Sequence, residues 1–209
     1  MSLISKLPKC LGPIFSIFIY FAVDASAEYR LGGYLGVGGT GIKTVSTINN
    51  TDVDVQRSNG PGILGASVEF LTSDTRSVSF EHTRGVYLSP FASGVSFTGV
   101  TWRWFLGGKA PSVTVKDDQT SYLIVTRKIP FLGVGTGVAA GTITRENDLV
   151  PNINASGIYI GFHGGYDYQV DPGKYFRVEA VFAATPTSSG FVKSSLSEFA
   201  LQIGLFLIL

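Results

Sequence analysis

The carboxyl-terminal segment places a large apolar side chain at every second position, and this alternation constrains the fold more than any other feature of the chain. A period of two is the repeat of a β-strand, whose successive side chains point to opposite faces, whereas a helix repeats about every 3.6 residues. The alternation runs to the last residue and comprises Phe199, Leu201, Ile203, Leu205, Leu207 and Leu209. Segment 196–208 is therefore predicted to be a strand with one strongly apolar face.

The same period recurs along the chain from Glu28 onward. Each alternating segment has one face of large apolar residues and one face of small or polar residues, and polar connections separate the segments. Besides the last, the predicted strands are 29–38, 62–72, 77–85, 96–106, 131–143, 156–168 and 174–185. The sequence therefore predicts an all-β fold of about eight antiparallel strands, each joined to the next in an up-and-down meander.

Composition indicates which faces point outward. Hydrophobic residues make up 44% of the chain and charged residues only 15%, which is too apolar for an ordinary water-soluble surface. A soluble barrel has a wet exterior, whereas a transmembrane barrel turns its apolar faces to lipid and its polar faces to the lumen. No internal stretch reaches the roughly 18 apolar residues of a membrane helix. We therefore predict an antiparallel transmembrane β-barrel.

Aromatic residues near the ends of several predicted strands would lie at one rim of such a barrel. Tyr and Trp favour the membrane–water interface because one edge of the ring is apolar and the other polar. The predicted aromatic belt comprises Trp102, Trp104, Tyr166, Tyr168 and Tyr175. The alternative interpretation is that these are ordinary core aromatics.

Charged residues at inward positions are predicted to form a network that plugs the lumen. Charges inside a narrow barrel need partners, because desolvation penalises each one that is left alone. The predicted network comprises Arg30, Glu69, Glu81, Arg103, His163, Asp167, Arg177 and Glu179, and Glu198 also falls on an inward face. The alternative is a solvated channel wall in which the same residues are unpaired.

The connections alternate between short and long. Segments 73–76 and 169–173 have the composition of tight turns, and outer-membrane barrels carry short turns on the periplasmic side and long loops outside. Segment 107–130 breaks this pattern, because it should be short; it could form a periplasmic hairpin, extend the fifth strand or complete a ten-stranded barrel. The expected outer loops are 39–61, 86–95, 144–155 and 186–195.

The first 27 residues have the three-part pattern of a secretion signal. Lys6 and Lys9 form a basic region, an apolar region runs from Leu11 to Val23, and small residues precede a cleavage site after Ala27. We therefore predict a signal peptide over 1–27 and a single barrel domain over 28–209.

With these features the chain resembles the small eight-stranded bacterial outer-membrane barrels, the class that includes the OmpA transmembrane domain, OmpX and OmpW. The resemblance rests on the signal-like start, the opening strand 29–38, the glycine-rich segment 130–137 and the terminal alternating strand. The chain departs from the family by ending in Leu209 instead of an aromatic residue. The resemblance implies a place in the outer membrane, contact with its lipid and lipopolysaccharide, and insertion by the barrel assembly machinery, which recognises such a terminal strand.

Three other kinds of site are not supported. Segment 36–41 fits the pattern G-x-G-x-x-G, but a nucleotide site needs a helix to begin there, and a Thr- and Asn-rich segment follows. His82 and His163 stand alone in the sequence, without the cluster that a metal site requires. No basic run marks a nucleic-acid surface. We expect no cofactor, no metal and no nucleic-acid partner.

The predicted function is a structural, adhesive or surface-interaction role for a plugged barrel. A narrow channel for small or apolar solutes is the alternative, since eight strands enclose a lumen just wide enough for side chains to fill. A lipid A-modifying enzyme is a further candidate, and Glu81-His82-Thr83 has suitable residue types. Neighbours on a strand point to opposite faces, so Glu81 is badly placed to orient His82, and we expect a protein that is not an enzyme. The sequence specifies neither a surface ligand nor an oligomeric state.

Overall fold

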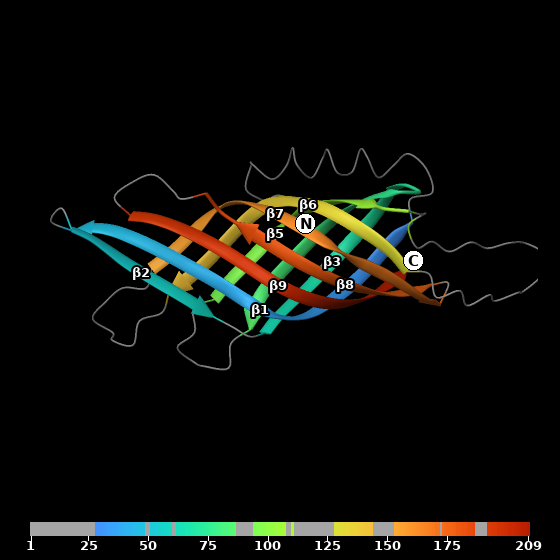
Figure 1. Ribbon diagram of the computed structural model, residues 1–209, viewed down its shortest axis with the longest axis horizontal. Coiled ribbons are helices and arrows are strands. Elements are labelled where there is room, and N and C mark those ends of the chain that lie inside the picture. Colours follow the sequence, from blue (N-terminus) through green and yellow to red (C-terminus); the bar gives the residue numbers. More distant parts are fainter. Residues whose placement is uncertain are drawn as a thin grey trace, which may run out of the picture.

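The computed structural model describes residues 28–48, 51–59, 62–86, 94–107, 110, 128–143, 153–171, 173–186 and 192–209. The predicted signal peptide and most of segment 107–130 lie outside these residues. In the described part of the chain, no helix is long and apolar enough to cross a membrane. The strands, shown in Figure 1, are β1 (Tyr29–Ile48), β2 (Thr51–Asn59), β3 (Gly62–Ser73), β4 (Arg76–Val86), β5 (Gly94–Phe105), β6 (Lys128–Ile143), β7 (Ile153–Asp171), β8 (Lys174–Ala184) and β9 (Val192–Ile208).

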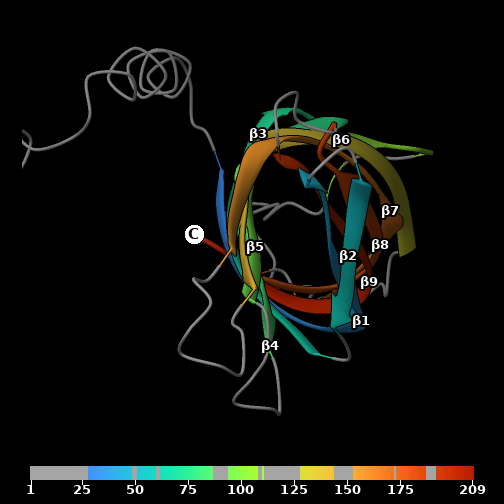
Figure 2. The ribbon, with the colours of Figure 1, turned by 90° about the vertical axis from the view of Figure 1, so that its left-hand side faces the viewer.

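These strands occupy eight positions around a closed antiparallel barrel (Figure 2). β1 pairs with β9 along one edge, which closes the sheet. Along its other edge β1 pairs first with β3 and then with β2, so β2 and β3 follow one another in a single position. The predicted eight-stranded meander is confirmed. Because the pairing of β1 with β9 completes the ring, the ten-stranded alternative is wrong.

The stagger of the strands can be followed from one directly paired residue to the next around the barrel. The path that leaves β1 at Leu31 returns to β1 at Gly41, ten residues further along. With eight strands, this stagger tilts each strand by about 40° from the barrel axis and leaves a lumen that side chains fill. The intermediate residues are Val68, Phe80, Val100, Thr136, Ile160, Ala184 and Ser197.

The two ends of the barrel differ, and one of them carries the short connections. At this turn end, Asp74 and Thr75 link β3 to β4, and a turn that includes Gly173 links β7 to β8. The turn predicted over 73–76 is confirmed. The turn predicted over 169–173 is shorter than expected, because β7 continues to Asp171 and β8 begins at Lys174. The start of β1 and the end of β9 also lie here, where the backbone N–H of Leu209 donates to the carbonyl of Tyr29 at 2.8 Å.

At the opposite, hairpin end, β1 and β2 extend beyond the neighbouring strands (Figure 1). The predicted loop 39–61 is wrong for most of its length, because residues 40–48 of β1 pair with residues 51–59 of β2. Val, Ile and Thr are frequent in this segment, and such β-branched side chains favour extended backbone. Polarity alone was therefore a poor guide to a loop.

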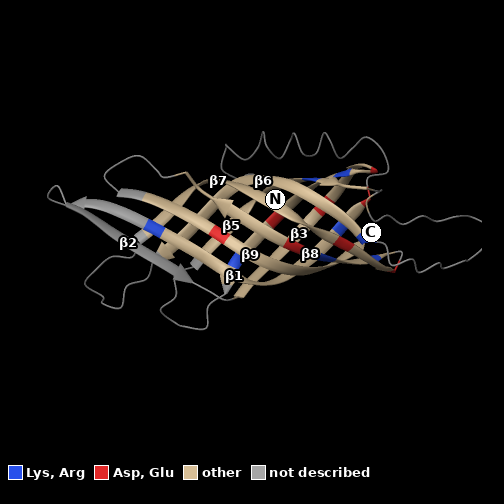
Figure 3. Cartoon of the chain, in the orientation of Figure 1, with Lys and Arg blue, Asp and Glu red and all other residues tan. Residues whose placement is uncertain are grey.

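Outward side chains are apolar and inward side chains are polar over most of the barrel. Large aliphatic and aromatic residues on the outside are among the most exposed in the molecule, for example Ile158 at 70% and Leu35 at 67%. Among the described residues, most charged side chains lie toward the turn end (Figure 3), and those on inward faces are buried. This arrangement is the inverse of a soluble protein and is that of a membrane barrel. The predicted inside and outside faces are confirmed.

Four of the five residues of the predicted aromatic belt have outward side chains. Trp102, Trp104 and Tyr166 are exposed on the outside, and Tyr168 is half-buried there. Tyr175, however, is fully buried in the lumen, so its place in the belt was wrong. Successive residues of a strand alternate between faces, so Tyr175 shares the inward face with Arg177 on β8 and lies away from the lipid.

Gly99 and Gly137 allow β5 and β6 to approach closely at the lumen wall, where the two residues pair directly. A Cβ at Gly137 would lie 2.2 Å from the carbonyl oxygen of Thr98, and one at Gly99 would lie 2.3 Å from that of Thr136. The phenol oxygen of Tyr159 would also meet a Cβ at Gly99, at 2.4 Å. Any larger residue at this pair would therefore have to move backbone atoms.

Candidate functional site

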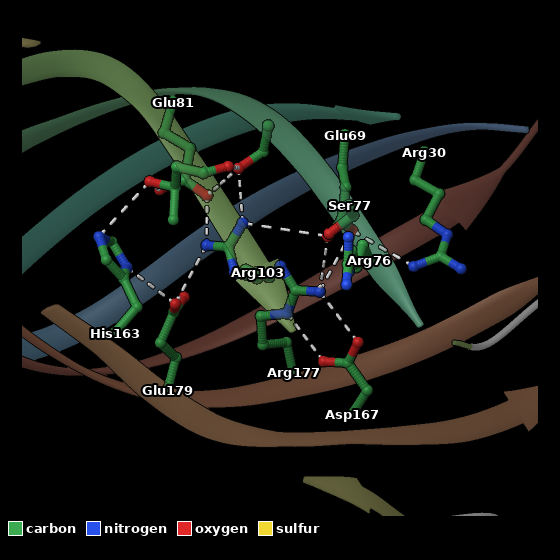
Figure 4. A network of polar contacts seen from close by, with 12 residues as sticks. Arg30, Glu69, Arg76, Ser77, Glu81, Arg103, His163, Asp167, Arg177 and Glu179 are labelled. Atoms are coloured by element: carbon green, nitrogen blue, oxygen red, sulfur yellow. Dashed lines mark hydrogen bonds and ion pairs between the residues drawn. The ribbon is translucent and has the colours of Figure 1, made fainter. Parts of the chain in front are cut away.

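The candidate site is a network of charged side chains that crosses the lumen (Figure 4). Arg30 on β1, Arg103 on β5 and Arg177 on β8 are fully buried there. A buried guanidinium is stable only with excellent geometry and complete hydrogen bonding. The lumen supplies carboxylates from five other positions, namely Glu69 on β3, Glu81 on β4, Asp167 on β7, Glu179 on β8 and Glu198 on β9.

Arg177 and its partners form the part of the network nearest the turn end. Its Nε lies 2.7 Å from Oδ1 of Asp167 and its Nη2 lies 2.9 Å from Oδ2, so the two side chains form a bidentate pair. The same Nη2 donates to Oε2 of Glu69 at 3.1 Å. Arg177 therefore ties β8 to β7 and, across the lumen, to β3.

Glu69 is the point at which most of the donors converge. Its Oε2 accepts from the Tyr175 hydroxyl at 2.7 Å and from Nη1 of Arg30 at 3.4 Å. Its Oε1 accepts from the Ser77 hydroxyl at 2.5 Å and lies 3.9 Å from Nη1 of Arg103. Charge-assisted hydrogen bonds of this kind are about twice as strong as neutral ones, so Glu69 links the three arginines.

Arg103 organises the part of the network further from the turn end. Its Nη2 donates to Oε1 of Glu81 and, at 3.0 Å, to Oε1 of Glu179. Oε1 of Glu179 also lies 2.9 Å from Nδ1 of His163. The eight residues predicted for the network thus lie together in one connected group, whereas Glu198 lies apart from it.

Aromatic rings flank the guanidinium groups inside the lumen. The guanidinium carbon of Arg177 lies 4.8 Å from the ring centre of Phe131 and 4.7 Å from that of Phe206. Tyr175 stacks on Phe206 with ring centres 4.8 Å apart. These cation–π contacts stabilise the guanidinium group of Arg177 through its planar faces. At the edge of the plane, its Nε and Nη2 donate hydrogen bonds.

A small cavity lies on the hairpin side of Arg103. The centre of a water molecule can range over about 20 Å³ there, which is room for about one water. Glu198 borders the cavity and accepts from the Thr83 hydroxyl at 3.2 Å and from Nε2 of Gln202 at 3.3 Å. Among the described residues, no basic side chain forms an ion pair with Glu198. The other lining residues are Glu81, Phe97, Tyr159, His163, Val181 and Ala183.

Beyond the cavity, a buried apolar cluster fills the lumen toward the hairpin end. Sequence analysis missed it, because inward positions were expected to be small or polar. On β1 every second residue faces the lumen, so Ile42 lies on the same inward face as Arg30 and Tyr34. On β9 Leu196 shares the inward face with Glu198 in the same way. Counting every second residue along each strand could therefore have identified the members of the cluster. The cluster consists of Ile42, Val95, Phe97, Ala139, Ala155, Tyr159, Ala183 and Leu196.

Sequence analysis also missed the neutral partners of the charged network. Each of them lies an even number of positions from an inward charged residue on the same strand, so it faces the lumen too. The two-residue repeat of the sequence could therefore have identified them. These residues are Tyr34, Ser77, Ser79, Thr101 and Tyr175.

One part of the network has the order of groups found in nucleophilic catalysis. Glu179 holds Nδ1 of His163, and Nε2 of the same ring lies 3.4 Å from Oγ1 of Thr101. A base oriented by an acid and directed at a hydroxyl can activate that hydroxyl. Here Thr101 instead donates to Oε2 of Glu81 at 2.9 Å, and the adjoining cavity has room for about one water. In this arrangement the proton of the Thr101 hydroxyl is used to stabilise the carboxylate of Glu81.

The described residues contain no group of three or more His, Cys, Asp or Glu side chains that could hold a metal ion. The cation–carboxylate contacts inside the lumen are instead made by arginine.

Comparisons with known proteins identify the fold. No protein-family model and no curated protein matches the chain. Among solved structures, OprG from Pseudomonas aeruginosa is 12% identical, with a TM-score of 0.55 over 88% of this chain and 96% of OprG. Neisserial surface protein A (NspA) is 12% identical, with a TM-score of 0.53 over 87% of this chain and 99% of NspA.

The outer-membrane protease OmpT from Escherichia coli also matches, with 8% identity and a TM-score of 0.48 over 87% of this chain and 97% of OmpT. The fold follows from the likenesses to OprG and NspA, and at such low identities they show the fold and nothing more. The chain has the fold of the small bacterial outer-membrane β-barrels.

Proposed function

We propose that this protein is an integral barrel of the bacterial outer membrane whose lumen is closed by its own side chains. Its role is then structural, adhesive or one of interaction at the cell surface. The observation that carries the proposal is the connected network from Arg30 through Glu69 and Arg103 to Glu179. It joins side chains from β1, β3, β5 and β8 across the lumen. Most of its polar atoms are hydrogen-bonded, whereas Nε of Arg103 and Nη1 of Arg177 have no partner among the described residues. Buried polar networks of this kind restrict the motion of their members.

The apolar cluster supports a closed lumen at a second position along the barrel axis, toward the hairpin end. Ile42 and Val95 are fully buried, and Leu196 is 1% exposed, although all three line the inside of the barrel. A continuous aqueous path would wet these side chains. Water entering from the hairpin end therefore meets an apolar layer before it reaches the charged network.

A narrow channel for small or apolar solutes is the alternative, and a flux assay distinguishes it. Liposomes that contain the purified barrel are loaded with a self-quenching dye and exposed to gradients of small sugars and of small apolar amides. We expect the rates of swelling and dye release to equal those of protein-free liposomes. Uptake of either class of solute that depends on the amount of barrel would establish the channel and contradict the closed lumen.

We further propose that the protein is not an enzyme. Thr101, His163 and Glu179 have catalytic residue types, but the cavity beside them is too small for a lipid or a peptide. Incubation of the purified barrel with lipid A and with unfolded peptides, followed by mass spectrometry, tests this point. A product that appears with wild type and disappears with His163→Ala would overturn it.

Export and assembly complete the proposal. We propose that the chain is cleaved after Ala27, is inserted by the barrel assembly machinery, and lies in contact with membrane lipid and lipopolysaccharide. The alternating apolar face of β9 supports recognition by the assembly machinery, because it is exposed along Phe199, Leu201 and Ile203. Mass spectrometry of the protein from outer membranes should give Glu28 as the first residue. Recovery of Cys10 in that fraction would contradict cleavage.

A further inference from the structure

A polar notch interrupts the apolar exterior of the barrel on β4 and β5. It consists of four outward residues in two directly paired rows, His82 with Thr98 and Arg84 with Ser96. His82 and Arg84 are exposed, and the two hydroxyl residues are half-buried. Nδ1 of His82 lies 2.7 Å from Oγ1 of Thr98, so the hydroxyl and the ring are already held together.

The notch lies near the edge of the apolar band that faces the hairpin end. Going along β4 from Arg76 at the turn end, the next two outward residues are apolar, namely Val78 and Phe80. The following two, His82 and Arg84, are polar. Eight residues of strand at about 3.3 Å each, tilted by about 40°, rise about 20 Å along the barrel axis. Outward bands of transmembrane barrels are about 25 Å tall. With Arg76 at the turn-end boundary, the backbone of Arg84 therefore lies about 5 Å inside the opposite boundary, and His82 lies deeper. The long side chain of Arg84 can extend from there to the boundary.

Among the described side chains, no carboxylate on this wall neutralises Arg84. The only acids in β3, β4, β5 and β6 are Glu69 and Glu81, and both face the lumen. Within the described residues, no ion pair involves Arg84. An arginine at the edge of lipid without a counter-charge is unfavourable, because the low dielectric medium penalises an unpaired charge. A negatively charged group from outside the chain would relieve this penalty.

We propose that the notch binds a phosphate group of a glycolipid in the outer leaflet of the outer membrane. The planar fork of Arg84 matches two phosphate oxygens, and the hydroxyl of Ser96 is a further donor. The single proton of the Thr98 hydroxyl is available to the phosphate when Nδ1 of His82 carries a proton and donates to Oγ1 of Thr98. A phosphate attached directly to a sugar lies at the boundary between headgroup and acyl chains, which is the level of the notch. The inference rests on the proposed placement of the barrel, with its hairpin end outside.

The test measures how strongly purified barrels retain lipid A in detergent micelles, by native mass spectrometry. Arg84→Gln keeps the size of the side chain and removes the charge, whereas Arg84→Lys keeps the charge and loses the fork. Arg76→Gln is the matched control, because Arg76 is also exposed on β4 but lies at the turn end. All variants must show the shift in gel mobility on heating that marks a folded barrel.

We expect Arg84→Gln to weaken retention of lipid A by about tenfold, as the loss of a charged hydrogen-bonding group does. Arg84→Lys should lie between this variant and wild type, and Arg76→Gln should match wild type. Dephosphorylated lipid A should bind wild type as weakly as lipid A binds Arg84→Gln.

Three results would overturn the proposal. Equal retention by wild type and Arg84→Gln would show that the notch does not bind the lipid. Equally strong retention of phosphatidylglycerol would show that any anionic lipid is sufficient. Displacement of lipid A by millimolar inorganic phosphate alone would show a site for the free ion. Ion conductance of the barrel is a separate readout that Arg84→Gln should leave unchanged, so failure of the notch and failure of the closed lumen are distinguishable.

Discussion

Arg177 and Asp167 face each other directly across β8 and β7 and join through two parallel hydrogen bonds, from Nε at 2.7 Å and from Nη2 at 2.9 Å. Both side chains are fully buried in the lumen. The pair therefore combines two constraints that are usually separate, the register of neighbouring strands and the charge balance of the interior. Because Nη2 also donates to Glu69, the pair extends across the barrel to β3.

Removing Arg177 should destabilise the barrel strongly. Arg177→Ala leaves Asp167 and Glu69 buried without their main partner, and breaking a buried pair in this way costs about 3–5 kcal/mol. Urea titration of the barrel folded into lipid vesicles measures the loss in free energy of unfolding. The matched control is Lys174→Ala, because Lys174 lies 4.0 Å from Asp171 in an exposed pair at the end of the same strand. The control should change stability by less than about 0.5 kcal/mol, and equal losses in both variants would show that burial of the network is unimportant.

The close approach of β5 and β6 should make Gly137 intolerant of substitution. A Cβ there would overlap the backbone of Thr98 at 2.2 Å, so the strands must separate. We expect Gly137→Ala to cost about 1–3 kcal/mol, as overpacked sites do, in the same titration. Gly33→Ala is the control, since its Cβ would lie 3.8 Å from the carbonyl oxygen of Gly65, an ordinary contact. A neutral Gly137→Ala would mean that these strands can move apart without penalty.

The outward face of β9 should respond to charge according to depth. Ile203 lies in the middle of the exposed apolar run from Phe199 to Leu207 and is 60% exposed. Ile203→Arg should cost about 2–4 kcal/mol, whereas Leu207→Arg, close to the turn end, should cost about 0–1 kcal/mol. Unfolding titrations in vesicles of fixed acyl-chain length give both values. Equal costs at the two depths would contradict a lipid environment for this face.

The barrel itself could be predicted from period-two alternation, because alternation fixes both the strand and its faces. The charged members of the lumen network followed from the same parity, since Arg30, Glu69 and Arg177 occupy inward positions. The pairs that Arg30 and Arg177 form with Glu69 did not follow, because these partners come from strands far apart in sequence and depend on a stagger of ten residues that only the closed barrel defines.

Two errors in the interpretation of the sequence have physical reasons. Tyr175 was assigned to the belt because Tyr favours interfaces, but its parity with Arg177 places it in the lumen, where its hydroxyl donates to Glu69. Segment 39–61 was assigned to a loop because it is polar, although its β-branched residues allow it to pair as a hairpin. In both cases residue type was given more weight than position along the strand.

The orientation of the barrel can be tested with epitope tags at its two ends. A tag inserted between Asn49 and Asn50 would lie between β1 and β2, at the tip of the hairpin, and the energetic cost of a longer connection grows slowly with length. We expect antibody to label this tag on intact cells. A tag inserted between Asp74 and Thr75, at the turn end, should be labelled only after the outer membrane is opened. The reverse pattern would show that the hairpin end faces the periplasm.

Planar-bilayer recording of the purified barrel tests the closed lumen most directly. We expect wild type to give no steady conductance steps, because Arg103 is fully buried between Glu81 and Glu179 and would block the middle of the lumen in the proposed plug. Arg103→Ala should admit ions and raise the leak current, while Lys174→Ala at the exposed turn should leave the current at the wild-type level. Large and steady conductance from wild type would contradict a lumen closed by its own side chains.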